Sequence, residues 1–542
     1  MTSGGSLVAG RWTTDGTTFH AVALSTGRLL PREFRAATSA DIAAACAAAA
    51  AAFDDFSVRS GAERGRLLCA IAAEVGALGD ELIRLAARET GLAEDRLRSE
   101  RDRTVMQLCL AGDLVGEGSW VEAIIDHGDA LRTPTPKPDL RRMLRPLGPV
   151  AVFGASNFPL AYSVAGGDTA SALAAGCPVV VKGHAAHPGT GEMVAAAVAQ
   201  AVQKCGLPAG TFSFLQSGGP ADQQIGATLV QNPHIRAVGF TGSVPGGNAL
   251  DAMARNRSEP IPVFAEMGSV NPVFILPHAL ESRGGTIAAR LAASVTSSSG
   301  QMCTCPGLIF VTAGESAEQF IAECARLIGA AGPQSMLSPR TRDNFLRRTR
   351  ELGDCEGVQA VVGAAATGPG RGSDRSSEAV CAPAVLLRTT RARLAERPMI
   401  AEEAFGPGTV VVVCEDAHAL RSAARENLPG SLTASIWAEG SDAALAREIH
   451  PLLCRRAGRV IFNGVPTGVE VCGAMVHSGP FPACNRPDST AVGPLNIRRW
   501  CRPVAFQNTP EVLLPAELRE SNPLSIFRVV DGRRTEPQRA RL

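Results

Sequence analysis

Apolar residues recur at helical spacing through residues 38–118, and this pattern predicts helices there. The four residues from Thr38 to Asp41 are typical of a helix N-terminal cap before an alanine run. Gly91 stands where the apolar pattern "RGRLLCAIAAEVGALGDELIRLAARETG" ends, so we expect it to stop a helix. This part of the chain is therefore expected to be largely helical.

From residue 148 the pattern changes to short apolar runs that alternate with helical stretches. Such alternation is typical of βαβ units around buried parallel sheets. We expect two α/β units in series, divided near residue 265. The expected strands are "PVAVFGAS", "PVVVKG", "TFSFLQS", "AVGFTGS", "PVFILP", "GLIFVTA", "VVVVCE" and "LTASIWA", and the expected helices lie at 165–176, 188–205, 281–299 and 316–330.

Two segments do not follow this alternation. Residues 119–147 end in "TPTPKPDLRRMLRPLG", which is rich in proline and basic residues and predicts an exposed ribbon or linker. Residues 491–507 contain "VGPLNIRRWCRPVAFQ", which alternates like an edge strand. Residues 508–542 form a tail, and its end after about 530 is polar and expected to fray.

Composition narrows the class of partner. The formal net charge of the 542 residues is +1 and only 19% are charged, a balance that favours neither nucleic acid nor an anionic membrane surface. The start of the chain lacks a signal-peptide pattern, and its most apolar run, residues 42–53, is too short to span a bilayer. The 15 cysteines show no disulfide framework, so we expect a cytoplasmic protein whose partner is a small molecule or another copy.

Two predicted strand ends carry groups suited to a nucleotide. In "GFTGSVPGG", Gly239 to Gly247, a strand runs into glycines where a helix begins, and a helix N-terminus suits a phosphate. Lys182 ends the strand "PVVVKG", where nucleotides bind in open α/β sheets. Taken singly, the first stretch also fits a plain βα turn, and the lysine also fits a solvated strand end.

Three further stretches hold polar groups in apolar surroundings. Asn157 in "ASNFPL" can donate to an oxyanion, or cap the next helix through an Asx-turn. Glu266 in "VFAEMGSVNP" fits a general base whose pKa is raised by desolvation, or a buried structural ion pair. The turn "EEAFGP", Glu402 to Pro407, offers a carboxylate for ribose hydroxyls and a ring for a flat heterocycle, or is simply acidic.

The stretch "GQMCTCPG" places two cysteines, Cys303 and Cys305, between glycines. A lone C-x-C supplies only two metal ligands, and no nearby histidine or cysteine completes a site, so no metal is expected. A redox pair, a nucleophile with a bystander, and buried filler remain as interpretations of the two residues.

Taken together, the order Asn157, Lys182, Gly-Ser loop, Glu266, Cys303 and "EEAFGP" resembles the aldehyde dehydrogenase superfamily over residues 10–510. The segments "RETGLAEDRLRSERDRT", "VVVKGHAAHPGTGE", "GQMCTCPG" and "NGVPTGVEVCGAMVHSGPFPA" are similar to its 2,5-dioxopentanoate (α-ketoglutarate semialdehyde) dehydrogenase branch, which also holds NADP-linked fatty-aldehyde relatives. The resemblance implies two Rossmann-like parallel-sheet α/β domains and a small oligomerisation β-ribbon. The implied parts are a dinucleotide-binding domain over 1–118 and 148–265, a catalytic domain over 266–460 with the nucleophilic cysteine, a ribbon over 119–147 and 491–507, and the tail over 508–542.

The same resemblance implies roles for single residues. Cys303 is the expected nucleophile, Asn157 the oxyanion donor and Glu266 the base that hydrolyses the thioester. Cys305 is interpreted as a bystander, with an oxidative link to Cys303 as the alternative. The residues expected to bind the cofactor are Lys182 for the adenosine ribose, Gly242 and Ser243 for the pyrophosphate, Glu403 for the nicotinamide ribose and Phe405 for the ring, with His184 and Gly247 as further cofactor-binding residues.

The resemblance also bears on the cofactor and on assembly. NAD-preferring relatives usually carry a glutamate three residues past the lysine, where this chain has Ala185. Lys182 and His184 are therefore expected to attract a 2′-phosphate, and NADP is expected to be preferred over NAD. The ribbon implies a homodimer or homotetramer.

The expected reaction is oxidation of 2,5-dioxopentanoate to 2-oxoglutarate. Arg103 in "ERDRT" is chosen over Arg101 as the cationic anchor, against the alternative of an ordinary surface salt-bridge face. Phe158 and Met302 are expected to line the aldehyde path, and the flexible Met302 to loosen selectivity. Three other functions stay open: a fatty-aldehyde dehydrogenase, a CoA-acylating relative, against which Glu266 argues, and a catalytically silent cofactor-binding scaffold.

Overall fold

Helices fill residues 38–118, as the apolar spacing predicts. The computed structural model describes residues 3–24, 26–363, 380–426 and 428–535. The Thr38 hydroxyl accepts from the Asp41 backbone N–H, and the Asp41 carboxylate accepts from the Thr38 N–H, which closes the predicted cap. Gly91 ends a helix in the left-handed conformation, at φ 67°. The helices are α1 (Ser39–Phe56), α2 (Gly61–Ala77), α3 (Gly79–Thr90) and α4 (Glu94–Glu117). Among the described helices, none is long and apolar enough to cross a membrane.

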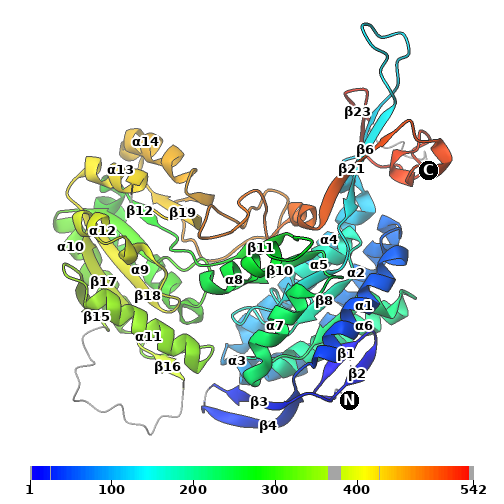
Figure 1. The fold of residues 1–542 in the computed structure, drawn as a ribbon. Helices are drawn as coiled ribbons and strands as arrows, with labels where there is room; N and C mark the ends of the chain where they lie inside the picture. The colour runs from blue at the N-terminus through cyan, green and yellow to red at the C-terminus, as the bar shows by residue number, and fades with distance from the viewer. Residues whose placement is uncertain (1–2, 25, 364–379, 427, 536–542) are drawn as a thin grey trace.

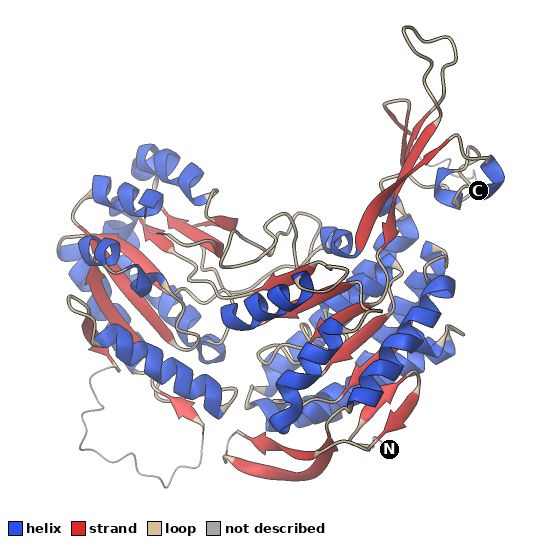
Figure 2. Cartoon of the chain, viewed as in Figure 1, coloured by secondary structure: helices blue, strands red, loops and turns tan. Residues whose placement is uncertain are grey.

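The first α/β unit is a seven-stranded sheet with helices on both faces (Figures 1 and 2). Five strands run parallel, and the N-terminal hairpin adds two antiparallel strands at one edge. The spatial order is β11 (Val263–Glu266), β10 (Ala237–Thr241), β7 (Val150–Phe153), β8 (Val179–Lys182), β9 (Phe212–Leu215), β1 (Ser6–Val8) and β2 (Arg11–Thr13).

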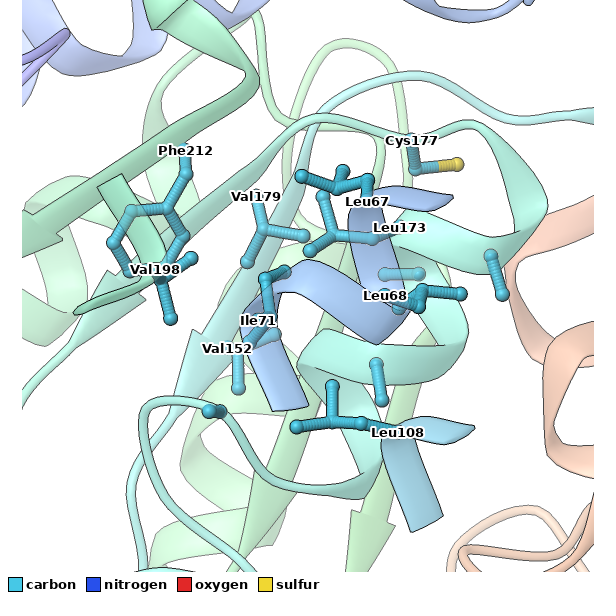
Figure 3. Close-up of a cluster of buried hydrophobic side chains, with 14 of the residues drawn as sticks. Leu67, Leu68, Ile71, Leu108, Val152, Leu173, Cys177, Val179, Val198 and Phe212 are labelled. Atoms are coloured by element: carbon cyan, nitrogen blue, oxygen red, sulfur yellow. The ribbon is translucent and has the colours of Figure 1, made fainter. Parts of the chain in front are cut away.

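Side chains that alternate along each strand of this sheet enter two different cores. One face packs against α2, α4, α5 (Gly167–Ala175) and α6 (Pro188–Lys204). Figure 3 shows part of this core, with Ile71 of α2 and Leu108 of α4 near Val152 of β7. The other face packs against α1, α7 (Asp222–Gln231) and α8 (Val244–Arg255). The carboxyl ends of the parallel strands thus share one edge, which is where Lys182 and Glu266 stand.

The second α/β unit is another seven-stranded sheet, parallel except for β15 at one edge. One face packs against α9 (Pro277–Thr296) and α10 (Glu315–Gly329). The other packs against α11 (Pro339–Gly353), α12 (Arg391–Glu396), α13 (Ala417–Glu426) and α14 (Ala443–Leu453). The spatial order is β15 (Gln359–Val362), β17 (Val385–Thr390), β18 (Gly408–Cys414), β13 (Leu308–Thr312), β12 (Val273–Ile275), β19 (Ser431–Trp437) and β20 (Ala457–Phe462). The predicted fold class of parallel-sheet α/β units is confirmed, and the domain boundaries stay predictions.

A third sheet projects away from these two units (Figure 1). It joins β21 (Cys501–Gln507), β6 (Leu140–Pro146), β5 (Ile124–Asp126), β22 (Arg528–Val530) and β23 (Arg533–Thr535). The prediction that the chain frays after about 530 is wrong up to Thr535, because β23 pairs with β22 there; residues 536–542 lie outside the described residues. Subunit pairing through this sheet stays a prediction.

Two short strand pairings were not among the elements expected from the sequence. They are the hairpin of β3 (Thr18–Ala23) with β4 (Arg28–Arg35), and the bridge of β14 (Gln334–Ser335) with β16 (Cys381–Ala382).

The expected edge strand over 491–507 is only half correct. Its second half is β21, which pairs antiparallel with β6, but Pro494–Trp500 form a 3₁₀ helix. One side of that helix is buried, and Trp500 donates from its indole to the Ser171 hydroxyl of α5 at 2.8 Å. Arg499 binds the Asp168 carboxylate at 2.6 Å and the Phe264 carbonyl at 2.9 Å. These contacts hold the residues just before β21, where the projecting sheet begins, against the first α/β unit.

We expect Arg499→Ala to destabilise the protein by roughly 3–5 kcal/mol, because it leaves the Asp168 carboxylate buried without its partner. The matched control is Arg347→Ala, which removes an exposed pair with Glu351 within α11 and should change stability by less than about 0.5 kcal/mol. Urea-induced unfolding of both variants measures the difference. A loss for Arg499→Ala no larger than that of the control would contradict this assignment.

Candidate active site

The loop that carries Cys303 is held in an unusual backbone conformation. Ser298, Ser299 and Gly300 have φ values of 49°, 57° and 63°, so three successive residues are left-handed. A Cβ placed on Gly300 would lie 2.2 Å from the carbonyl oxygen of Gly406. Only glycine allows the two backbones to come this close, so the loop after α9 packs directly against the "EEAFGP" turn. Consecutive left-handed residues cost free energy that the surrounding contacts must offset, which is common at functional sites.

Cys303 meets two titratable side chains from other parts of the chain. Its Sγ lies 3.5 Å from His477 Nε2, and the same nitrogen lies 3.0 Å from Glu266 Oε1. The side chains of His477 and Glu266 are 1% and 2% exposed. Burial and the neighbouring Glu266 charge raise the pKa of the Cys303 thiol well above its ordinary value. The resting nucleophile is therefore a thiol, and a base must take its proton as it attacks.

His477 is a residue that the sequence reasoning missed. The argument that no histidine lies near Cys303 is wrong, because the fold brings His477 across 174 residues of sequence. Its backbone N–H donates to the Thr490 hydroxyl at 2.9 Å, which fixes its place beside Glu266 at the end of β11. The available signal was the segment "NGVPTGVEVCGAMVHSGPFPA", which contains this histidine.

Two asparagines hold the nucleophile loop. Asn157 Nδ2 donates to the Gln301 carbonyl at 3.0 Å, so its amide reaches the nucleophile loop. Asn271, which the sequence reasoning did not single out, donates to the carbonyls of Cys303 at 2.8 Å and Cys305 at 2.9 Å. The site thus places an amide donor next to Cys303, while the oxyanion role of Asn157 stays a prediction.

The second cysteine of the loop faces away from this cluster. Cys305 Sγ lies 4.0 Å from the carbonyls of Val295 and Gly406, whereas Cys303 Sγ contacts His477. Burial raises the pKa of the Cys305 thiol to about 12, so it is not a reactive thiolate. This environment fits the bystander interpretation.

The predicted adenosine-ribose residues lie at the carboxyl edge of the first sheet. Lys182 Nζ binds the Asp222 carboxylate at 2.7 Å, at the start of α7. Burial acts to raise the pKa of Asp222, but Lys182 and Ser217 outweigh it and hold that pKa below its ordinary value. Burial, with the charges of His187 and Lys182, lowers the pKa of His184 to about 3. His184 is therefore neutral near pH 7, so it could meet a phosphate only through a hydrogen bond, and its cofactor role stays a prediction.

The predicted phosphate loop is the N-terminus of α8. Ser243 caps this helix by accepting from the Gly246 N–H at 3.3 Å, and Gly242 N–H donates to the Glu266 carbonyl at 3.0 Å. A Cβ on Gly247 would lie 2.5 Å from Met267 Sδ, so any side chain here would have to displace Met267. The geometry fits both a βα turn and a phosphate-binding helix N-terminus, and the phosphate role stays a prediction.

A cavity between the nucleophile loop and the "EEAFGP" turn gathers several predicted residues. Met302, Cys305, Glu403 and Phe405 all line it. Burial raises the pKa of Glu403 to about 8, against the opposing hydrogen bond from the Ser269 backbone. A carboxyl that is largely protonated at neutral pH can both donate to and accept from a hydroxyl.

The predicted substrate arginine lies beside an aromatic wall. Arg103 of α4 donates to the Tyr162 hydroxyl at 3.4 Å, and its Nε is buried with no hydrogen-bond partner among the described residues. Phe158 packs edge-to-face on Tyr162 with ring centroids 5.4 Å apart. Arg101 instead binds exposed Asp102, as the surface alternative proposed. Tyr162 in turn lies beside His477, with ring centroids 6.3 Å apart, so Arg103 stands one side chain away from the cluster. Its charge acts to lower the pKa of the Cys303 thiol.

A second arginine near the cluster comes from a distant strand. Arg459 of β20 donates to the Pro466 carbonyl at 2.6 Å and the Gly468 carbonyl at 2.9 Å, which holds the "NGVPTGVEV" loop. Its Nε is also buried without a partner among the described residues. Burial lowers the pKa of Arg459, and the thiol of Cys303 and the phenol of Tyr162 act to raise it. The two guanidiniums thus both act electrostatically on the nucleophile.

Comparison with known proteins places this site in a family. The profile of the Aldehyde dehydrogenase family matches residues 12–479. The α-ketoglutaric semialdehyde dehydrogenase 2 of Azospirillum brasilense is 46% identical, covering 92% of this chain and 93% of that protein. The α-ketoglutaric semialdehyde dehydrogenase of Acinetobacter baylyi is 42% identical, covering 92% of each. A crystal structure of betaine aldehyde dehydrogenase from Staphylococcus aureus in complex with NAD+ shares the fold, with a TM-score of 0.78 at 18% identity over 94% of this chain and 97% of that one. The chain belongs to the aldehyde dehydrogenase family and is an NAD(P)-dependent aldehyde dehydrogenase.

Proposed function

We propose that this enzyme oxidises 2,5-dioxopentanoate, the α-ketoglutaric semialdehyde named in two relatives, to 2-oxoglutarate. The observation that carries the chemistry is the contact of Cys303 Sγ with His477, which in turn contacts Glu266. Arg103 favours this substrate over one without a carboxylate. Its Nε is a buried donor without a hydrogen-bond partner among the described residues, and a guanidinium binds a carboxylate well. A purely hydrophobic aldehyde would leave that donor unsatisfied, which disfavours the fatty-aldehyde alternative.

The residues of the cluster divide the reaction into two steps. Cys303 Sγ bonds to the aldehyde carbon while its proton passes to His477 Nε2, which releases it to solvent before the next turnover, and the amide of Asn157 stabilises the oxyanion. Glu266 stays ionised through this step. The nicotinamide cofactor, when bound, accepts the hydride. Glu266 then takes a proton from water, which attacks the thioester at Cys303 and breaks the carbon–sulfur bond. The buried Glu266 oxygen Oε2 has no partner among the described residues and is available for that water.

The chain offers a fitting site for a nicotinamide dinucleotide. Lys182 and Asp222 stand at the carboxyl edge of the first sheet. The N-terminus of α8 follows β10 at the same edge, with β7 between β10 and the strand that ends in Lys182. Glu403 and Phe405 line the cavity next to the nucleophile loop. Lys182 would hold the adenosine ribose and Glu403 the nicotinamide ribose. We propose that NADP is preferred, because Ala185 supplies no carboxylate to repel a 2′-phosphate and Lys182 attracts it.

The Glu266 charge gives a prediction with a definite sign. Because that carboxylate raises the pKa of Cys303, Glu266→Gln should lower it, and alkylation of Cys303 by iodoacetamide should accelerate at a fixed pH near 8. Steady-state oxidation should nevertheless fall by about 10²-fold or more, because the thioester loses its base. The control Cys305→Ser should leave both rates unchanged. Slower alkylation in Glu266→Gln would contradict the assigned electrostatics.

Arg103 is testable against its neighbour on the same helix. We expect Arg103→Ala to reduce kcat/KM for 2,5-dioxopentanoate by about tenfold or more and to leave pentanal unchanged, because only the first substrate offers a carboxylate to the guanidinium. The matched control is Arg101→Ala, which removes an exposed ion pair and should change neither value. Equal losses on both substrates would show that Arg103 acts on the fold and not on the carboxylate.

The proposed preference for NADP should depend on how many carboxylates lie near Lys182, because each one competes with the 2′-phosphate for the lysine. Removing the Asp222 charge frees the lysine, so Asp222→Asn should raise the ratio of kcat/KM for NADP+ over NAD+ by about tenfold. Ala185→Glu adds a carboxylate and should lower the same ratio. Initial rates with both cofactors measure it, and a wild-type ratio below one, or a shift of either variant in the opposite direction, would contradict the proposed NADP preference.

A further inference from the structure

The three groups of the catalytic cluster also form a set of metal ligands. Cys303 Sγ, His477 Nε2 and a Glu266 carboxylate oxygen all lie within 4.8 Å of one another. We propose that this cluster binds Zn²⁺ reversibly and that the bound ion switches the enzyme off. The inference rests on the proposed function only in taking Cys303 as the nucleophile, since metal binding itself requires no turnover.

The spacing of the donor atoms suits tetrahedral zinc. Zinc–ligand bonds of about 2.0–2.3 Å to sulfur, nitrogen and oxygen place neighbouring donors of a tetrahedron roughly 3.3–3.8 Å apart. The observed separations are 3.5 Å from Cys303 Sγ to His477 Nε2 and 3.0 Å from that nitrogen to Glu266 Oε1. The third pair, Cys303 Sγ and a Glu266 carboxylate oxygen, lies within 4.8 Å, so small side-chain movements would bring the three donors to this spacing, and the fourth position stays open for water.

The donors are held in place before any ion arrives. The His477 and Glu266 side chains are almost fully buried, and the His477 backbone is fixed by Thr490. Glu266 pairs through its backbone with Cys484 in an isolated bridge. Its Oε2 atom is buried with no hydrogen-bond partner among the described residues, so an acceptor points into the site unsatisfied. Little conformational freedom is therefore lost on binding.

Charge favours a dication bound by these three groups. On binding, the Cys303 thiol proton leaves to solvent and its thiolate takes the ion, with no change in oxidation state. The thiolate and the Glu266 carboxylate together neutralise Zn²⁺, which limits the cost of burying charge. Arg103 and Arg459 oppose the approaching cation, but they face a neutral complex once it has formed. A thiolate among the ligands selects zinc over magnesium or calcium.

Bound zinc would block the reaction at its first step. The sulfur lone pair that attacks the aldehyde is the one given to the metal, and neither His477 nor Glu266 can then move a proton. A chelator that removes the ion restores all three groups. The ion is thus an inhibitor of the enzyme and no part of its catalytic cycle.

The test uses Co²⁺ as a spectroscopic stand-in for zinc on tag-free, reduced protein without oxygen. We expect one Co²⁺ per chain with a thiolate-to-cobalt charge-transfer band and tetrahedral visible bands, both lost when Zn²⁺ is added. Zn²⁺ should abolish activity at about stoichiometric concentration, and EDTA should restore it. Cys305→Ser should behave like the wild type, and Cys303→Ser should lose the charge-transfer band.

His477→Gln decides whether the histidine is a ligand. It should weaken Zn²⁺ binding by about 100-fold or more, measured by competition with a chromophoric chelator. Thermal unfolding like that of the wild type confirms that this variant is folded. A charge-transfer band that survives in Cys303→Ser, or equal zinc affinity in His477→Gln, would place the ion at other thiols and overturn the proposal. If the enzyme failed to oxidise 2,5-dioxopentanoate, the cobalt spectra would still decide the metal site.

Discussion

The position of the Cys303 sulfur depends on a backbone that only tight contacts can hold. Three successive left-handed residues precede it, and Gly300 meets the Gly406 carbonyl at a distance that no side chain would allow. Asn271 then binds the carbonyls on both sides of Thr304. Because these contacts come from the second sheet and its turn, the nucleophile is fixed to that unit while Glu266 belongs to the first sheet. The active site therefore exists only where the two sheets meet.

Burial gives this cluster its chemical character. The imidazole and the carboxylate are almost fully buried and the thiol beside them is half-buried, so the charge of each group strongly changes the others. The resting state keeps the proton on sulfur, which protects the nucleophile from adventitious oxidation, since the thiolate is the species that oxidants attack. Two arginines supply positive potential from outside the cluster. The same proximity that allows proton transfer also makes the groups competent metal ligands.

The sequence predicted correctly those features that interactions between residues close together in the chain determine. The cap at Thr38, the stop at Gly91 and the parallel strands follow from hydrogen bonding and apolar spacing over a few residues. Cys303, Glu266 and Asn157 were found because their order along the chain resembles a family. His477, Asn271 and Arg459 were not, because they reach the site through tertiary contacts that no local spacing reports. The alternating pattern predicted a strand where residues 494–500 form a 3₁₀ helix, because the contact of Trp500 with α5 overrides that pattern.

The central claim is a covalent reaction at Cys303 that Glu266 completes. Mass spectrometry of Glu266→Gln, quenched after a single turnover with 2,5-dioxopentanoate and NADP+, tests it most directly. We predict one acyl group per chain, on the peptide that contains Cys303, with one equivalent of NADPH formed and only slow release of 2-oxoglutarate. NADPH formation with no acyl group on Cys303, or an acyl group on Cys305, would contradict the account.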